Sequence, residues 1–182
     1  QMCIRDRGDL SFIADNMDMI GITDGATAGT GGGRYGKADL VSFNNVGNIE
    51  FRGLNHGGIG FSRLNSLAFT NTGDISFTDM KMGYSSNGGA IFINQGGDSS
   101  LYSNPGDGNI SFDHTGSIIF RNLVKTSYYM SSAGIFTNEG SISFNDTENI
   151  LFENNTSTGG PAAIGIGSVS YTHLRAHETL SD

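Results

Sequence analysis

A short element, an aliphatic residue followed two positions later by phenylalanine, recurs along most of this chain and limits what it can fold into. Neighbouring copies are often eight residues apart. The spacing of two places both apolar side chains on one face of a strand. We therefore predict many strands of about three to five residues, each too short to be stable alone. The copies are Leu10/Phe12, Val41/Phe43, Ile49/Phe51, Ile59/Phe61, Leu67/Phe69, Ile75/Phe77, Ile110/Phe112, Ile118/Phe120, Ile142/Phe144 and Ile150/Phe152.

Two further marks recur with these elements. In a Phe-x-Asn tripeptide, the Asn stands where a strand must bend, at Asn45, Asn71, Asn94, Asn122, Asn138 and Asn154. Small residues also precede an isoleucine four times, at Ile59, Ile91, Ile135 and Ile164. These isoleucines are 32, 44 and 29 residues apart, which are intervals that fit successive coils of a solenoid.

Together these marks predict an all-β fold, a fragment of a right-handed parallel β-helix. Each buried Phe or Ile contributes on the order of 1.5 to 3 kcal/mol, and Asn side chains at the corners can bond backbone groups that a bend leaves unpaired. A β-sandwich or an irregular antiparallel domain is the alternative, because short strands at regular spacing suit either. The predicted core consists of Phe43, Phe51, Phe61, Phe69, Phe77, Ile91, Phe112, Phe120, Phe144 and Phe152.

The composition narrows the classes of function. The chain has 28 Gly and no Trp, with 10 Lys and Arg against 18 Asp and Glu, for a net charge of −8. Nucleic acid is therefore excluded as an expected partner, because its binding needs clustered Lys and Arg. No apolar run approaches the length that spans a membrane as a helix, so we expect no membrane insertion by this segment.

The two ends of the chain have an unusual relation to each other. Codons for residues 2–7 can be chosen so that their reverse complement encodes residues 169–173, as inverted adapters around a DNA insert would produce. We therefore predict that residues 1–7 and 169–182 are adapter-derived, disordered tails and that residues 8–168 form the repeat fragment. The single Cys3, an Arg-Gly-Asp at Arg7 and the His173/His177 pair are set aside with these tails.

Motifs for catalysis and ligand binding are weak within residues 8–168. The segment 31–38 resembles a phosphate-binding loop, but Ala38 stands where Ser or Thr would bind Mg²⁺ and a strand follows it. No carboxylate pair with the separation needed for glycoside cleavage is evident. His56 and His114 are isolated, and the calcium-binding nonapeptide is absent. We expect no cofactor and no metal.

The repeat resembles a known family. Gly88-Gly89-Ala90-Ile91 and Phe152-Glu153-Asn154-Asn155 look like the GGA-I and F-x-x-N repeats of chlamydial polymorphic outer-membrane proteins and related autotransporter passengers. The resemblance covers roughly residues 38–165, where most copies are Phe-x-Asn. It implies a stalk or adhesin on the extracellular side of the outer membrane, without enzymatic activity, and a β-barrel translocator elsewhere in the full-length chain.

The resemblance also implies a binding partner, and the predicted fold leaves one alternative function open. The resemblance implies contact with a host-cell or matrix surface, and the insertion at residues 96–107 is the candidate contact region. The alternative function is a carbohydrate-active β-helix enzyme, a polysaccharide lyase or hydrolase, because several such enzymes use this fold. Two or three Asp side chains converging in an open groove would favour that alternative.

Overall fold

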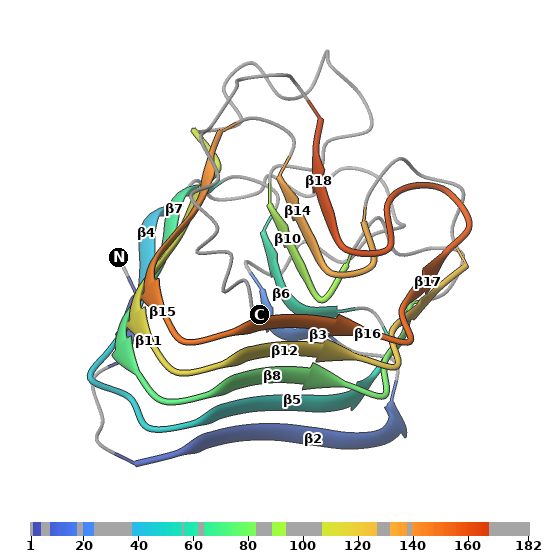
Figure 1. Ribbon diagram of the computed structural model, residues 1–182, viewed down its shortest axis with the longest axis horizontal. Helices are drawn as coiled ribbons and strands as arrows, with labels where there is room; N and C mark the ends of the chain where they lie inside the picture. The colour runs from blue at the N-terminus through green and yellow to red at the C-terminus, as the bar shows by residue number, and fades with distance from the viewer. Residues whose placement is uncertain are drawn as a thin grey trace, which may run out of the picture.

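The strands wind into coils that stack along one axis (Figure 1). This computed structural model describes residues 2–4, 8–17, 20–23, 38–55, 57–61, 64–82, 89–93, 107–126, 132–137 and 140–167. Within these ranges the chain forms strands and turns and no helix. Parallel strands join into stacked sheets, which confirms the predicted parallel β-helix.

Four parallel sheets form the sides of the stack. Sheet A contains β1 (Met2–Ile4), β4 (Ala38–Asn44), β7 (Leu64–Thr72), β11 (Asn109–Thr115) and β15 (Ile142–Thr147). Sheet B contains β2 (Leu10–Met17), β5 (Ile49–Leu54), β8 (Ile75–Thr78), β12 (Ile118–Arg121) and β16 (Ile150–Glu153). Sheet C contains β3 (Ile20–Thr23), β6 (Gly57–Phe61), β10 (Ile91–Ile93), β14 (Ile135–Thr137) and β18 (Ile164–Ile166). Sheet D contains β9 (Lys81–Met82), β13 (Val124–Lys125) and β17 (Thr156–Ser157).

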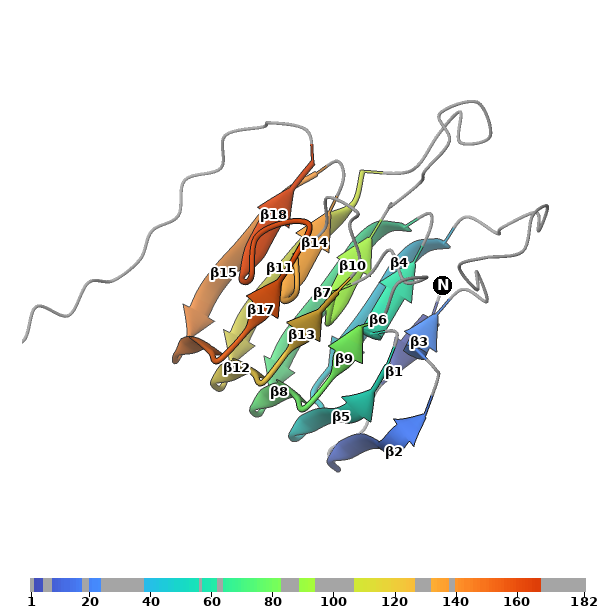
Figure 2. The same cartoon turned by 90° about the vertical axis from the view of Figure 1, so that its right-hand side faces the viewer.

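Copies eight residues apart lie in neighbouring sheets of the stack, because about eight residues lead from one strand to the next. Ile59/Phe61 lie in β6 of sheet C, Leu67/Phe69 in β7 of sheet A and Ile75/Phe77 in β8 of sheet B. The longer intervals, between the isoleucines that follow small residues, separate equivalent positions in successive coils. In sheet C the isoleucines of β6, β10, β14 and β18 pair in register, as the small-residue marks predict. Figure 2 shows the resulting order of coils from blue to red.

Register explains why the antiparallel alternative is wrong for the described residues. Every pairing between described strands is parallel, and like residues face like residues: Phe69 pairs with Phe112, and Ile75 with Ile118. A parallel pair needs a connection that returns the chain to the same end of the sheet. The remainder of each coil provides that connection.

The small residues of sheet C have a packing role. A Cβ added to Gly58 would lie 2.5 Å from a ring carbon of Phe77, and one on Gly134 would lie 2.8 Å from a ring carbon of Phe152. Real Cβ atoms do not approach so closely, so these positions must be glycine where sheet C faces the rings of sheet B. Ala90 and Ala163 occupy the equivalent positions before Ile91 and Ile164, so this column requires small residues but is not restricted to glycine.

The N-terminal segment differs from expectation in one place. Residues 2–4 were expected to lie in a disordered tail, but the structure places them in β1, with Met2 paired to Val41 and Ile4 to Phe43. Their apolar residues have the same spacing of two as the repeat, which suits the edge of sheet A. Whether these residues derive from an adapter stays a prediction. Residues 168–182 lie outside the described residues.

Candidate functional site

Two columns of phenylalanine rings run through the interior. Adjacent rings have centroids 4.7 to 5.1 Å apart and planes within 6° of parallel. This distance is set by the spacing of parallel strands. One column, in sheet B, contains Phe12, Phe51, Phe77, Phe120 and Phe152, and the other, in sheet A, contains Phe43, Phe69, Phe112 and Phe144.

The two remaining residues of the predicted core lie in sheet C. Phe61 is buried in β6 and pairs with Ile93, so its column continues with an aliphatic side chain. Ile91 is buried in β10 between Ile59 and Ile135. The interior of sheet C is thus lined mainly by isoleucine.

The structure assigns the predicted corner asparagines to two different corners. Asn45 directly follows β4, and Asn71 is the next-to-last residue of β7; both lie at the corner between sheets A and B, which we call the AB corner. Asn122 and Asn154 follow strands of sheet B and lie at the corner between sheets B and D, the BD corner. Asn94 and Asn138 lie outside the described residues. The sequence motif is shared, but the four described residues do not form one column.

Backbone conformation explains why Asn occupies both corners. All four have φ between 52° and 56°, the left-handed region that Asn tolerates better than most residues. Other residue types hold the same corners in other coils, and the Phe-x-Asn motif misses them. At the AB corner these are His114 (φ 52°) and Asp146 (φ 46°), and at the BD corner Gly53 (φ 72°) and Asp79 (φ 56°).

A polar ladder runs along the AB corner, three residues beyond the left-handed position. The oxygen of one side chain accepts a hydrogen bond from the backbone N–H of the next coil. The N–H of Asn48 donates to Asp9 Oδ1 (2.7 Å), that of Asp74 to Asn48 Oδ1 (2.9 Å) and that of Ser117 to Asp74 Oδ1 (2.8 Å). Asn149 Nδ2 then donates to Ser117 Oγ (3.3 Å). This ladder mixes Asp, Asn and Ser and does not consist of the predicted corner asparagines. Two of those form a contact of their own at the BD corner, where Asn154 Nδ2 donates to Asn122 Oδ1 (3.5 Å).

Glycines lie directly above the side chains of this ladder. A Cβ on Gly73 would lie 2.5 Å from Asn48 Oδ1, and one on Gly116 would lie 2.5 Å from Asp74 Oδ1. In the last coil the equivalent position is Glu148, whose N–H donates to Thr115 O (3.2 Å) as that of Gly116 does to Thr72 O (3.1 Å). The ladder residue beneath Glu148 is Ser117, whose side chain is shorter. A Cβ at Gly73 or Gly116 would also lie 2.9 to 3.1 Å from backbone atoms of the preceding coil, so the ladder side chain is one of two reasons for glycine there.

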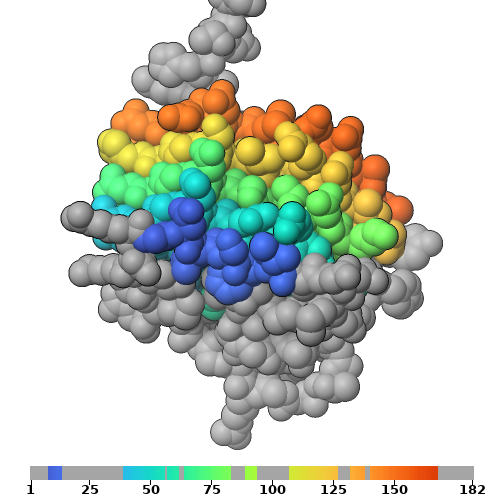
Figure 3. All heavy atoms as spheres, turned by 90° about the horizontal axis from the view of Figure 1, so that it is seen from below, coloured from blue at the N-terminus to red at the C-terminus, as the bar shows by residue number. Residues whose placement is uncertain are grey.

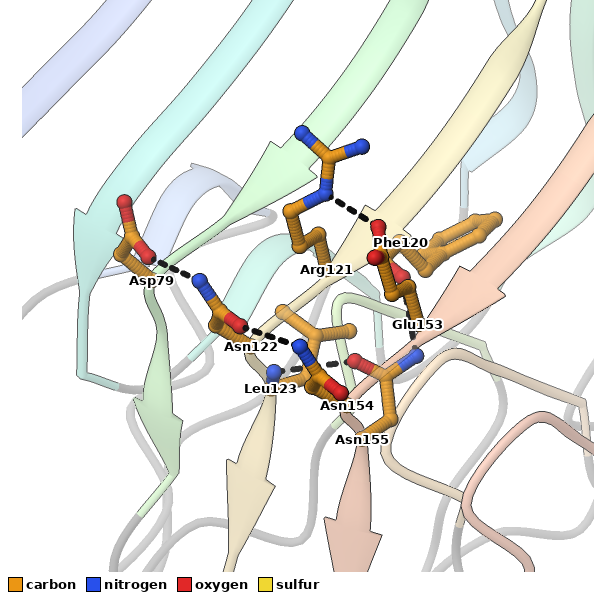
Figure 4. A network of polar contacts seen from close by, with 8 residues as sticks. All are labelled: Asp79, Phe120, Arg121, Asn122, Leu123, Glu153, Asn154 and Asn155. Atoms are coloured by element: carbon orange, nitrogen blue, oxygen red, sulfur yellow. Dashed lines mark hydrogen bonds and ion pairs between the residues drawn. The ribbon is translucent and has the colours of Figure 1, made fainter.

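The BD corner carries a second network (Figure 4). Asn122 Nδ2 donates to Asp79 Oδ1 (2.8 Å). Asn155 bridges two backbone groups of the preceding coil: its Oδ1 accepts the N–H of Leu123 (2.9 Å) and its Nδ2 donates to Phe120 O (2.9 Å). On the outer face Arg121 Nε lies 2.6 Å from Glu153 Oε2. These contacts hold the last three coils together at this corner.

One titratable cluster lies on the surface near the AB corner. His114 Nδ1 is 3.0 Å from Asp113 Oδ1 and His114 Nε2 is 3.2 Å from Asp146 Oδ2, so the imidazole bridges two coils. Asn145 Nδ2 donates to the same Asp113 oxygen (2.5 Å), and this bond lowers the pKa of Asp113 despite partial desolvation. Two carboxylates thus converge here, on an exposed corner.

The central strand of sheet D, β13, carries a buried lysine. Lys125 is fully buried and pairs in register with Met82 on one side and Ser157 on the other. Burial lowers the pKa of this amine below its ordinary value of 10.5, because desolvation disfavours the charged form. Sequence reasoning missed this residue, since nothing in the dipeptide Val124-Lys125 indicates which way it faces.

Other features from the sequence fall outside the described residues. These are the glycine-rich loop at 31–37, His56, most of the insertion at 96–107 and the two histidines near the C-terminus. Within the described ranges, no group of three or more His, Cys, Asp or Glu is placed to hold a metal ion. The same ranges contain no helix long and apolar enough to cross a bilayer.

Comparison of the chain with protein-family models, curated proteins and solved structures finds no match in any of the three.

Proposed function

We propose that this chain is a segment of a bacterial surface-exposed autotransporter passenger that acts as a stalk or adhesin. The observation that carries the proposal is the unbroken ring column of sheet B, which passes through all five strands. A column in which each coil contacts only its neighbours can be extended without a new core. Each added coil lengthens the stack by about 4.8 Å, the spacing of parallel strands.

The outer surface suits exposure to solvent. Figure 3 shows the face of sheet B as bands of successive coils. Charged side chains on this face are paired with each other, Arg121 with Glu153 (2.6 Å) and Arg52 with Glu50 (3.7 Å). The net charge of −8 opposes nonspecific association. Solenoids bind partners through such extended faces and their loop insertions, and a host-cell or matrix surface is the partner that the resemblance implies.

Surface display tests the proposal directly. Residues 8–168 would be placed between a signal peptide and an outer-membrane β-barrel translocator in a Gram-negative host. We expect antibody labelling of intact cells, a protease-resistant passenger, and adhesion to host cells or matrix proteins if the segment is an adhesin. The matched control is Phe77→Ala, which should reach the surface but lose protease resistance. Retention inside the cell would contradict the proposal.

The same cells test the alternative. If cells that display the segment release soluble sugar from acidic polysaccharides, the result would instead favour a carbohydrate-active enzyme. Loss of that release in Asp113→Asn and Asp146→Asn, with an unchanged far-UV circular dichroism spectrum, would assign it to the carboxylates around His114.

A further inference from the structure

The tripeptide Asn-x-Ser/Thr, which is the acceptor sequence for sugars linked to the asparagine amide, occurs four times in the chain. The four copies begin at Asn109, Asn145, Asn154 and Asn155. A bulky sugar can be added to a folded chain only at its surface. We therefore compare the four tripeptides by the exposure and the contacts of the asparagine and of the hydroxyl residue two positions later.

Two of the asparagines are partly buried and are held by a neighbouring coil. Asn155 Nδ2, the atom that would carry the sugar, donates to Phe120 O (2.9 Å). Two positions later, the Oγ of Ser157 is buried. The Oδ1 of Asn109 accepts both the N–H (3.0 Å) and the hydroxyl (2.8 Å) of Ser141. Neither asparagine is therefore placed to accept a sugar in the folded chain.

The third asparagine, Asn145, is exposed, but both polar groups of its tripeptide are engaged. Its Nδ2 donates to Asp113 Oδ1 (2.5 Å), and Thr147 Oγ1 accepts the hydroxyl of Thr115 (3.1 Å). Thr147 is only partly exposed. In the two preceding coils the residues in register with Asn145 are Asp113 and Thr70, and both are only partly exposed. This position on sheet A is therefore not an open one along the stack.

Asn154 lies at the BD corner, which is exposed in every coil that the structure describes there in full (Figure 4). The same left-handed position is occupied in the two preceding coils by Asp79 and Asn122, and both are exposed as Asn154 is. The exposure of Asn154 thus follows from the corner and not from its place in the last coil. Its Nδ2 donates to Asn122 Oδ1 at 3.5 Å, a longer contact than that of Asn122 with Asp79 (2.8 Å).

The hydroxyl residue of this tripeptide, Thr156, is exposed as well. It is the outward residue of β17, and the residues in register with it in the two preceding coils are Val124, which is partly exposed, and Lys81, which is exposed. Among the four tripeptides, the one that begins at Asn154 is therefore the only one with an exposed asparagine and an exposed hydroxyl residue.

We propose that Asn154 is a glycosylation site, the one acceptor that the fold leaves open among the four tripeptides. In the transfer, Asn154 Nδ2 forms a bond to C1 of a sugar carried on a nucleoside diphosphate. The bond between C1 and the diphosphate oxygen breaks, the nucleoside diphosphate leaves with the electron pair, and Nδ2 gives one proton to a base of the transferase. A side-chain amide has two hydrogens, so the remaining one keeps the contact with Asn122. This inference does not rest on the proposed function.

Treatment of the purified, folded chain with a soluble N-glycosyltransferase and UDP-glucose tests the site. Mass spectrometry of the intact chain and of its proteolytic peptides should show one added hexose, at Asn154. Thr156→Ala removes the hydroxyl of the acceptor sequence and should abolish this mass shift. Asn154→Gln keeps an amide at the corner and should abolish it as well. The matched controls, Thr147→Ala and Ser157→Ala, disrupt the neighbouring tripeptides and should leave the shift unchanged.

Short synthetic peptides separate the effect of the fold from that of the local sequence. Peptides that carry the tripeptides of Asn109 and Asn145 should accept hexose from the same transferase, although the folded chain does not at these positions. A folded chain without hexose at Asn154 would overturn the proposal, and so would comparable labelling at any of the other three asparagines. Peptides that accept hexose only at Asn154 would also overturn it, because the local sequence and not the fold would then select the site.

Discussion

Burial of the Lys125 amine makes the stability of the fold depend on pH. Its folded-state pKa is lowered below the ordinary value of 10.5, so the unfolded chain binds more protons between those two values. The free energy of unfolding should therefore rise with pH across this alkaline window. Lys125→Met removes the titrating group and matches Met82 in the same column. We expect the alkaline rise to be lost in that variant.

Urea unfolding at several pH values up to 10.5 measures this difference. The control is Lys81→Met, one position earlier than Met82 in β9, because the Lys81 side chain is exposed. That substitution should leave the alkaline rise unchanged. Parallel pH profiles for the unmodified chain and Lys125→Met would contradict the assignment.

Substitution of Gly47 tests whether a ladder side chain requires glycine directly above it. A Cβ at this position collides with Asp9 Oδ1, while its nearest backbone atoms are 3.2 and 3.3 Å away. Gly47→Ala should therefore lower the free energy of unfolding by about 1–3 kcal/mol, as overpacking does. Asp9→Ser shortens the side chain beneath it and reproduces the natural combination of Glu148 above Ser117.

The double variant should be more stable than the sum of the single changes predicts, and a double-mutant cycle in urea measures this coupling. Asp9→Ser alone is the control and should cost about 1 kcal/mol, for the weakened bond to the N–H of Asn48. Strictly additive costs would show that the two positions do not interact.

At the scale of the strand, the loss of unfolding free energy on removing a phenylalanine ring should depend on the position of that ring in its column. Phe77 is fully buried, with Phe51 at 4.8 Å on one side and Phe120 at 5.1 Å on the other. Phe77→Ala should lower stability by about 3–5 kcal/mol. Phe152 is only partly buried and has one ring neighbour among the described residues. Phe152→Ala should cost clearly less in the same urea titration, and equal costs would argue against a nearest-neighbour stack.

The repeat of an aliphatic residue and phenylalanine allowed the strands, their inward faces and the parallel stacking to be predicted. Side chains two apart must share a face, and marks that recur with the same residue types need a common environment. The isoleucine intervals even gave the register of sheet C, because Ile59, Ile91 and Ile135 pair directly. These features are local, or repeat along the chain, so a single sequence contains them.

The corners could be predicted only in part. A left-handed backbone position accepts Asn, Asp, His or Gly, so Asn71 was recognised and its partner in the next coil, His114, was not. The ladder position was missed because its residue type changes between coils. The bridge of His114 to Asp113 and Asp146 depends on which coils are adjacent, and loops of different length hide that in the sequence.

For the whole molecule, stability should grow with the number of coils, because each coil contacts only its neighbours. The interval from Ile118 to Ile150 is one complete coil in register, and hydrogen bonds across it join residues 32 apart. Duplicating residues 118–149 directly after Asn149 should therefore add one coil. The free energy of unfolding and its dependence on urea should both increase, since more surface is buried.

The ladder limits which residue the added coil can carry at the position directly above Asn149. In the duplicate, the residue copied from Glu148 lies above Asn149 instead of Ser117, and Asn fills the space that Ser leaves open. A duplicate with glycine at that one position reproduces Gly73 above Asn48 and should fold with the full gain. The duplicate that keeps Glu should be less stable than its glycine counterpart by about 1–3 kcal/mol. Equal urea midpoints for the two duplicates would show that the ladder does not control how coils stack.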